Sequence, residues 1–212
     1  METIAILGTG LMGSSLGLAL RKRGAPVRIH AYARRPATRE AALNLGIADA
    51  VFSDPAEAVR GADIVVLCVP VLTIPKLAKA CRAGLKPGVI LTDVGSTKAC
   101  LNKLMAEALA GTGAEFIGSH PICGSEQQGI EAGNADLYEG AMTVVTPPPL
   151  ANESGVAFTM PMTRGRSSLR KRPAQSSCGE VSNMDQIPTA SLVVGIGRPT
   201  VLQKSAILGS CL

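Results

Sequence analysis

The chain has 212 residues, of which 46% are hydrophobic but only 2% aromatic, and it contains no tryptophan. A core must therefore be built from Val, Ile, Leu and Ala, as is typical of a buried parallel sheet covered by helices. The net charge is +5, and residues 151–212 account for most of it, with 7 Lys and Arg against 3 Asp and Glu. This distribution predicts no nucleic-acid-binding surface.

The cysteines and histidines give no metal-site pattern. The 6 cysteines have no Cys-x-x-Cys spacing, and 2 histidines cannot complete a zinc site with them. The longest apolar run, residues 64–74, is interrupted by Pro70 and is too short to span a bilayer. The N-terminus begins on a strand pattern and not on a signal-peptide pattern. We therefore expect reduced thiols and a cytoplasmic protein with no membrane partner.

Apolar, β-branched segments alternate with segments of helical periodicity over residues 1–150. The predicted strands are 3–7, 27–32, 63–69, 89–94, 115–118 and 142–146. The predicted helices are 11–23, 36–45, 55–60 (capped by Asp54), 74–83 and 96–109. Such alternation gives βαβ units with right-handed crossovers. It predicts an α/β fold for residues 1–150, a Rossmann-type, doubly wound domain with a mostly parallel sheet.

The composition changes after three consecutive prolines, Pro147 to Pro149. Residues 151–212 are rich in Ser, Arg, Pro and Gly, and they show no sustained helical period. Only residues 190–196 have a strand pattern, and the sequence offers no obvious partner for that strand. We expect an irregular or disordered C-terminal extension. The alternative is a basic tail that binds an acidic partner.

The segment Gly8-Thr-Gly10-Leu-Met-Gly13 fits the Gly-x-Gly-x-x-Gly pattern between a predicted strand and a predicted helix. That context is the one in which the pattern indicates dinucleotide binding. Gly8 would permit a tight turn, Gly10 would let the backbone approach a pyrophosphate, and Gly13 would let helix and strand pack closely. Backbone N–H groups at the helix start, including Leu11 and Met12, would bind the anion. The alternative is a purely structural turn.

Arginines follow the second predicted strand, where NAD-preferring sites usually carry Asp or Glu. The strand is followed by Ala33-Arg34-Arg35, and a guanidinium group suits the 2′-phosphate of NADP. We therefore expect Arg34 and Arg35 to bind the cofactor and NADP to be preferred over NAD. If these arginines form only a solvated turn, NAD can still be the cofactor.

Two polar segments follow later strands, at the sheet edge where open α/β folds bind their ligands. They are Thr92-Asp-Val-Gly-Ser-Thr-Lys98 and Gly118-Ser-His-Pro121. His120 comes after a predicted strand, in a Gly-rich loop, and its imidazole would titrate near neutral pH. It is a candidate proton acceptor. His30, inside a predicted strand, is interpreted as structural.

These segments and two others together resemble the prephenate/arogenate dehydrogenase family of tyrosine biosynthesis. The similarity runs in order over residues 3–147 and includes residues 8–20, Asp93-Val-Gly-Ser-Thr-Lys98, Gly118-Ser-His-Pro-Ile-Cys-Gly-Ser-Glu126 and Asp136-Leu-Tyr-Glu-Gly140. The resemblance implies NAD(P)-dependent oxidative decarboxylation of prephenate to 4-hydroxyphenylpyruvate, or of arogenate to tyrosine. His120 would accept the proton of the ring 4-hydroxyl group.

The resemblance also implies roles for residues near His120. Ser96 would hydrogen-bond the substrate hydroxyl or the imidazole, although it is also a candidate helix cap. Glu126, with Ser125, would lie at the mouth of the substrate pocket. Lys98 is interpreted as a surface residue of the first helical turn. Cys123 has no basic neighbour in the sequence that would lower its pKa.

The family resemblance further implies a homodimer built through a helical second domain, which is not recognisable in residues 151–212. We therefore expect a truncated or frame-shifted member with impaired turnover. One alternative is a non-catalytic NADP-binding module. Another is a 3-hydroxyacid dehydrogenase-like or imine reductase-like oxidoreductase, which would be expected to use a lysine of a later domain in place of His120.

Overall fold

The computed structural model describes residues 1–146 and 192–194. The strands of its central sheet are β1 (Glu2–Leu7), β2 (Val27–Tyr32), β3 (Ala50–Phe52), β4 (Ile64–Leu67), β5 (Ile90–Asp93) and β6 (Glu115–Phe116). Among the described residues they form a six-stranded sheet in the order β3-β2-β1-β4-β5-β6, and every pair is parallel. The order reverses between β1 and β4, which is where doubly wound folds bind ligands. The predicted fold class is confirmed.

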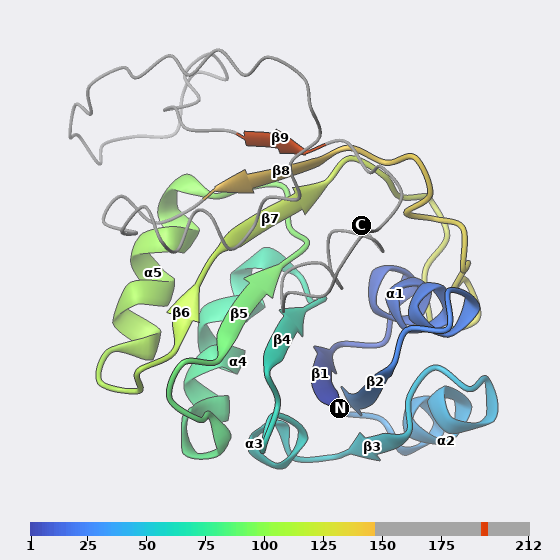
Figure 1. Cartoon of the computed structure of the whole chain (residues 1–212), viewed down its shortest axis with the longest axis horizontal. Helices are drawn as coiled ribbons and strands as arrows, with labels where there is room; N and C mark the ends of the chain where they lie inside the picture. Colours follow the sequence, from blue (N-terminus) through green and yellow to red (C-terminus); the bar gives the residue numbers. More distant parts are fainter. Residues whose placement is uncertain (147–191, 195–212) are drawn as a thin grey trace.

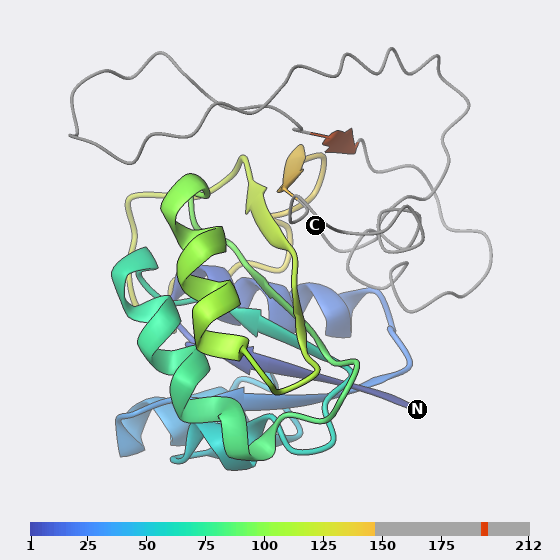
Figure 2. The ribbon, with the colours of Figure 1, turned by 90° about the vertical axis from the view of Figure 1, so that its left-hand side faces the viewer.

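Helices cover both faces of this sheet (Figures 1 and 2). The helices are α1 (Leu11–Lys22), α2 (Pro36–Asn44), α3 (Pro55–Ala58), α4 (Ile74–Cys81) and α5 (Ala99–Leu109), with 3₁₀ turns η1 (Val71–Thr73) and η2 (Arg82–Gly84). The predicted cap of α3 is confirmed, because Asp54 Oδ1 accepts a hydrogen bond from the Ala56 N–H at 3.1 Å. None of the helices in the described ranges is long and apolar enough to cross a membrane.

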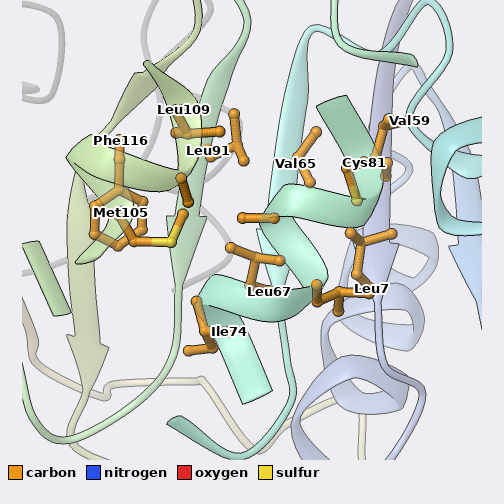
Figure 3. Packing of buried hydrophobic residues seen from close by; sticks show 14 of the residues in the cluster. Leu7, Val59, Val65, Leu67, Ile74, Cys81, Leu91, Met105, Leu109 and Phe116 are labelled. Atoms are coloured by element: carbon orange, nitrogen blue, oxygen red, sulfur yellow. The ribbon is translucent and has the colours of Figure 1, made fainter. Parts of the chain in front are cut away.

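The core is divided between the two faces by the alternation of side chains along each strand. In β1, Ala5 and Leu7 pack toward α4 and α5, whereas Ile4 and Ile6 pack toward α1. Figure 3 shows the first of these clusters, in which side chains of the sheet interlock with those of α4 and α5. Burial of each large aliphatic side chain contributes about 1.5–3 kcal/mol to the stability of the fold. This packing holds the strand ends, where the candidate site lies, in place.

A second, antiparallel sheet lies beyond the carboxyl end of β5 (Figure 1). Within the described residues it has three strands in the order β7-β8-β9, which are β7 (Gly118–Pro121), β8 (Thr143–Thr146) and β9 (Leu192–Val194). The prediction of one strand over 115–118 was wrong at its end, since the chain leaves the parallel sheet after Phe116 and enters β7. Strand β9 lies within the predicted 190–196 segment, and its partner, which the sequence did not reveal, is β8.

The remaining predictions for the C-terminal part cannot be compared with the fold. Residues 147–191 and 195–212 lie outside the described residues. The predicted domain boundary at residue 150 and the predicted irregular extension therefore stay predictions.

Candidate active site and cofactor loop

The loop between β1 and α1 has three glycines with different steric surroundings. Gly8 has φ +105°, and a Cβ there would lie 2.5 Å from the carbonyl oxygen of Cys68. A Cβ on Gly13 would lie 1.9 Å from the carbonyl oxygen of Gly8. By contrast, a Cβ on Gly10 would meet no atom within 4 Å. Packing thus requires Gly8 and Gly13, while Gly10 leaves open space through which a ligand can approach the backbone.

The start of α1 offers hydrogen-bond donors to an anion. The first helical hydrogen bond runs from the Ser14 N–H to the Gly10 carbonyl oxygen at 2.9 Å, so the N–H groups of Leu11 and Met12 precede the helical ladder. No side chain caps this end within the described structure, and the first turn has no acidic residue. The positive end of the helix dipole is therefore available to a phosphate group, and the loop fits a dinucleotide.

The Asp136–Gly140 motif contacts the start of α1. Tyr138 is buried, its hydroxyl donates a hydrogen bond to the Met12 carbonyl oxygen at 2.8 Å, and burial raises its pKa. Ser15 Oγ accepts a hydrogen bond from the Asn134 N–H at 2.9 Å. The sequence analysis assigned no role to this motif. The structure shows that it packs against the cofactor loop from residues more than 100 positions away in the chain.

The turn after β2 is basic, as predicted, and is ordered by a third arginine. Arg34 and Arg35 are exposed. Arg39, on α2, donates from Nη1 to the carbonyl oxygens of Ala33 at 3.1 Å and Arg34 at 2.8 Å. The sequence analysis did not single out Arg39. Its position one helical turn beyond Arg35 was the available signal.

Asp93 and Lys98 form a buried ion pair at the carboxyl end of β5. Asp93 is fully buried, and its Oδ2 lies 2.6 Å from Lys98 Nζ and 3.0 Å from the Gly95 N–H nitrogen. Lys98 Nζ also donates to the Gly95 carbonyl oxygen at 2.5 Å, and its side chain is only 11% exposed. The interpretation of Lys98 as a surface residue of a helical turn is therefore wrong.

The same contacts explain where α5 begins. The Asp93 carboxylate and the Lys98 ammonium hold residues 93–98 in a closed turn, so the helix starts at Ala99 and not at Ser96. Ser96 is exposed and does not cap α5. Burial raises the pKa of the Asp93 carboxyl, while Lys98 and the N–H groups of Gly95 and Ser119 oppose this rise. Burial lowers the pKa of Lys98.

His120 lies on β7, opposite Val144 of β8. It is thus part of a strand, and its predicted place in a loop was wrong. Ser119, the preceding residue, donates its N–H to Asp93 Oδ1 at 3.2 Å and its hydroxyl to the Asp93 carbonyl oxygen at 2.5 Å. Thr92 Oγ1 donates to Ser119 Oγ at 3.1 Å. These bonds attach the second sheet to the end of β5, one residue from the imidazole.

The surroundings of His120 favour its neutral form. Burial lowers the pKa of His120 below its ordinary value of 6.5, and the nearby Lys98 charge lowers it further, whereas Asp93 raises it. The imidazole is half-buried, so it can still meet a ligand at the sheet edge. A neutral imidazole near pH 7 can accept a proton.

The other predicted catalytic and substrate residues are exposed, and their side chains form no hydrogen bond with this network in the described part of the chain. Ser96, Ser125 and Glu126 are exposed, and no hydrogen bond joins Ser96 to His120 in the described part of the chain. Ser125 Oγ accepts a hydrogen bond from the Gln127 N–H at 3.0 Å. Burial raises the pKa of Cys123, in agreement with the expectation that nothing near it lowers that pKa. The structure thus brings together Asp93, Lys98, Ser119 and His120, and the roles of the exposed residues stay predictions.

Comparison with known proteins decides the family. Residues 16–162, more than half of the chain, match the family described as prephenate dehydrogenase, nucleotide-binding domain. The chain belongs to the prephenate dehydrogenase family. The match begins after the Gly8–Gly13 loop, so the interpretation of that loop rests on its own geometry. It also extends beyond residue 150, where the sequence analysis placed the end of the domain.

Relatives within the prephenate dehydrogenase family differ in how much of the chain they cover. Cyclohexadienyl dehydrogenase of Zymomonas mobilis is 35% identical over 155 residues, which are 73% of this chain and 52% of that protein. Prephenate dehydrogenase of Bacillus subtilis is 29% identical over 199 residues, covering 91% of this chain and 53% of that protein. The chain therefore spans about half the length of these relatives.

A solved member of the family has the same fold. The crystal structure of prephenate dehydrogenase from Aquifex aeolicus, in complex with hydroxyphenyl propionate and NAD⁺, has a TM-score of 0.67 and 31% identity. The similarity covers 74% of this chain and 55% of that chain.

The three loop glycines allow a test that separates cofactor binding from folding. We expect Gly10→Ala to leave the free energy of unfolding unchanged, because its Cβ would meet no atom within 4 Å. It should weaken NADP binding about 10–100-fold, because the methyl group would hinder charge-assisted hydrogen bonds to the backbone. Urea unfolding and titration of NADPH fluorescence measure the two effects.

Two further variants serve as controls. Gly13→Ala should reduce stability by about 1–3 kcal/mol, because of its clash with the Gly8 carbonyl oxygen. Gly84→Ala creates the same 1.9 Å clash, with the Ala56 carbonyl oxygen, and should destabilise the fold without changing the affinity of the folded fraction. Wild-type NADP affinity in Gly10→Ala would contradict the cofactor assignment.

Proposed function

We propose that this chain provides the cofactor-binding and proton-accepting half of an enzyme that catalyses NAD(P)-dependent oxidative decarboxylation of prephenate or arogenate. The observation that carries the proposal is the placement of His120. It lies half-buried beyond the carboxyl end of β5, on the sheet edge that also holds the glycine loop, and its surroundings favour the neutral imidazole. The family membership supports a cyclohexadienol as the substrate class.

In the proposed reaction His120 accepts the proton of the substrate 4-hydroxyl group as the hydrogen on the same carbon leaves as hydride. The ring carboxylate is then lost as carbon dioxide, and the ring becomes aromatic, with the proton returned to the phenol oxygen. A bound nicotinamide cofactor supplies the hydride acceptor. Ser96 would hydrogen-bond the 4-hydroxyl group or the imidazole, and Ser125 and Glu126 would contact the substrate. All three side chains are exposed and accessible to it.

NADP is the proposed preferred cofactor, with NAD as the alternative. The exposed guanidinium groups of Arg34 and Arg35 support this preference, as does Arg39, which fixes the backbone carbonyl groups of the same turn. A guanidinium fork can bind a 2′-phosphate through two hydrogen bonds. The Aquifex aeolicus structure, by contrast, contains NAD⁺, so the two cofactors must be compared directly.

Arg34→Ala should weaken NADPH binding about 10–100-fold, because it removes charge-assisted hydrogen bonds, and should leave NADH binding nearly unchanged. The measurement is a fluorescence titration with each reduced cofactor. Arg60→Ala removes an exposed arginine beyond α3 and is the matched control, for which neither affinity should change. If Arg34→Ala lowered the affinities for NADPH and NADH equally, the proposed preference for NADP would be contradicted.

The proposed activity is tested by the absorbance of reduced nicotinamide, with prephenate and arogenate each combined with NADP and NAD. Cofactor reduction with either substrate supports the proposal and identifies the preferred pair. If the chain binds the cofactor but reduces it with neither substrate, the alternative of a non-catalytic NADP-binding module is favoured. Light scattering of the same sample tests the homodimer that the family resemblance implies.

A further inference from the structure

The Asp93 carboxylate is completely buried and accepts hydrogen bonds from three groups, two in the residue 93–98 turn and one on β7. The donors are the Gly95 N–H, the Lys98 ammonium and the Ser119 N–H. Taking a carboxylate and an ammonium out of water is unfavourable. A contribution to fold stability is therefore a weak explanation for the burial of this pair. The position of this pair next to His120 offers another reason.

Ser119 connects the ion pair to the strand that carries His120. Its N–H and its hydroxyl donate to two different atoms of Asp93, the carboxylate Oδ1 and the carbonyl oxygen. The Ser119 hydroxyl in turn accepts a hydrogen bond from Thr92. Strand β7 belongs to the antiparallel sheet. These contacts therefore fix the position and the rotation of β7 relative to β5, immediately before His120.

Lys98 contacts the same strand one residue earlier. A Cβ on Gly118 would lie 2.9 Å from Lys98 Cδ, so the aliphatic part of Lys98 runs close to the backbone where β7 begins. Its ammonium binds Asp93 Oδ2 and the Gly95 carbonyl oxygen. The side chain thus lies between the residue 93–98 turn and β7.

We propose that the Asp93–Lys98 ion pair is a positioning device for His120, which holds Ser119 and thereby sets the orientation of the imidazole at the sheet edge. This inference rests on the proposed role of His120 as proton acceptor. In this proposal Asp93 and Lys98 act through Ser119 and Gly118, as positioning residues.

The arrangement also predicts electrostatic coupling of opposite sign from the two partners. Lys98 and Asp93 are the charged groups that act on His120 in the described part of the chain, beside the larger effect of burial. The Lys98 charge lowers the pKa of His120, and the Asp93 charge raises it. Neutralising Lys98 should therefore raise the pKa of His120, and neutralising Asp93 should lower it.

The test is an NMR titration of the imidazole signals of the full chain. The chain has only two histidines, and His120→Asn assigns the remaining signal to His30. Asp93→Asn should lower the pKa of His120, Lys98→Met should raise it, and the double variant should return it toward the wild-type value. Lys86→Met is the matched control, because Lys86 pairs with Asp63 at the opposite edge of the sheet, and it should leave the titration unchanged.

Two results of the titration would overturn the proposal. If both single variants raised the pKa of His120, loss of burial would explain the result and the pair would serve only the fold. An unchanged pKa in Asp93→Asn would show that the pair is not coupled to the imidazole. If Lys98→Met does not fold, Asp93→Asn and the double variant still decide, since the first must lower the pKa and the second must restore it.

Turnover separates this proposal from the proposed function. In an active preparation Asp93→Asn should lower kcat up to about 10²-fold, as expected for a misplaced reacting group, without a matching rise in KM for the cofactor. Full turnover of His120→Asn would reject the proposed base and leave the titration result intact. Normal kcat in Asp93→Asn, with His120→Asn inactive, would reject only the positioning role.

Discussion

Replacing His120 with Asn should lower kcat by about 10²–10⁴-fold while the affinity for NADP stays close to that of the wild type. Asn is smaller than His and cannot accept a proton near neutral pH. The cofactor affinity should be retained because His120 is not part of the Gly8–Gly13 loop. Steady-state rates with the preferred substrate, together with a fluorescence titration of NADPH, measure the two quantities on one sample.

The pH profile provides an independent check on the same residue. The base must be neutral, so kcat/KM should be constant above the pKa of His120 and fall as the pH drops through it. Burial and the Lys98 charge lower that pKa, so the acidic limb should lie below pH 6.5.

The other histidine is the natural control for His120→Asn. His30 Nδ1 lies 3.1 Å from the Ala58 carbonyl oxygen and its ring lies 5.1 Å from that of Phe52, in agreement with a structural role. His30→Asn should reduce stability and leave kcat of the folded protein unchanged. A wild-type kcat in His120→Asn, or an acidic limb unaffected by that substitution, would exclude His120 as the base.

Local patterns were sufficient to predict the parallel sheet because each strand and helix has a strong period of its own. In β1 and β4 the residues are apolar on both faces, as in a sheet with helices on each side. One short parallel strand, β3, was missed, whereas the shorter β6 fell within the predicted 115–118 strand. Strand β3 has only three residues, too few to show a period, and its place is set by pairing with β2.

The contacts that organise the site could not be read from local patterns because they join distant residues. The bonds from Ser119 to Asp93 cross between two sheets. The Gly118–Pro121 segment is a strand in place of a loop because it pairs with β8, which is more than 20 residues away in the chain. Lys98 was misinterpreted for a related reason, since helical periodicity continues back to Ser96 but the Asp93 carboxylate competes for the backbone of that turn. Sequence reasoning thus singled out His120 as the candidate proton acceptor but not the groups that hold its strand.

Lys98→Met should lower the free energy of unfolding by about 3–5 kcal/mol at pH 7, the usual cost of removing one partner of a buried ion pair. The methionine side chain has nearly the same length, so packing against Gly118 is retained while Asp93 keeps a charge with no cation beside it. Urea unfolding of wild type and variant measures the difference. Lys86→Met is again the control. The Lys86 side chain, which pairs with Asp63, is 41% exposed. Its replacement should lower the free energy of unfolding by only about 0–1 kcal/mol.

The pH dependence of this loss has a definite sign. Without Lys98, burial raises the pKa of the folded-state Asp93 carboxyl further above its ordinary value of 3.8, so the folded state binds a proton more tightly than the unfolded state. Such a group contributes stability at low pH and loses it as the pH rises through the folded-state pKa. The difference between wild type and Lys98→Met should therefore shrink as the pH falls toward 3.8.

Asp93→Asn combined with Lys98→Met should recover part of the loss at pH 7, because no charge is then buried. A loss that is independent of pH and undiminished in the double variant would mean that Lys98 stabilises the fold through packing alone.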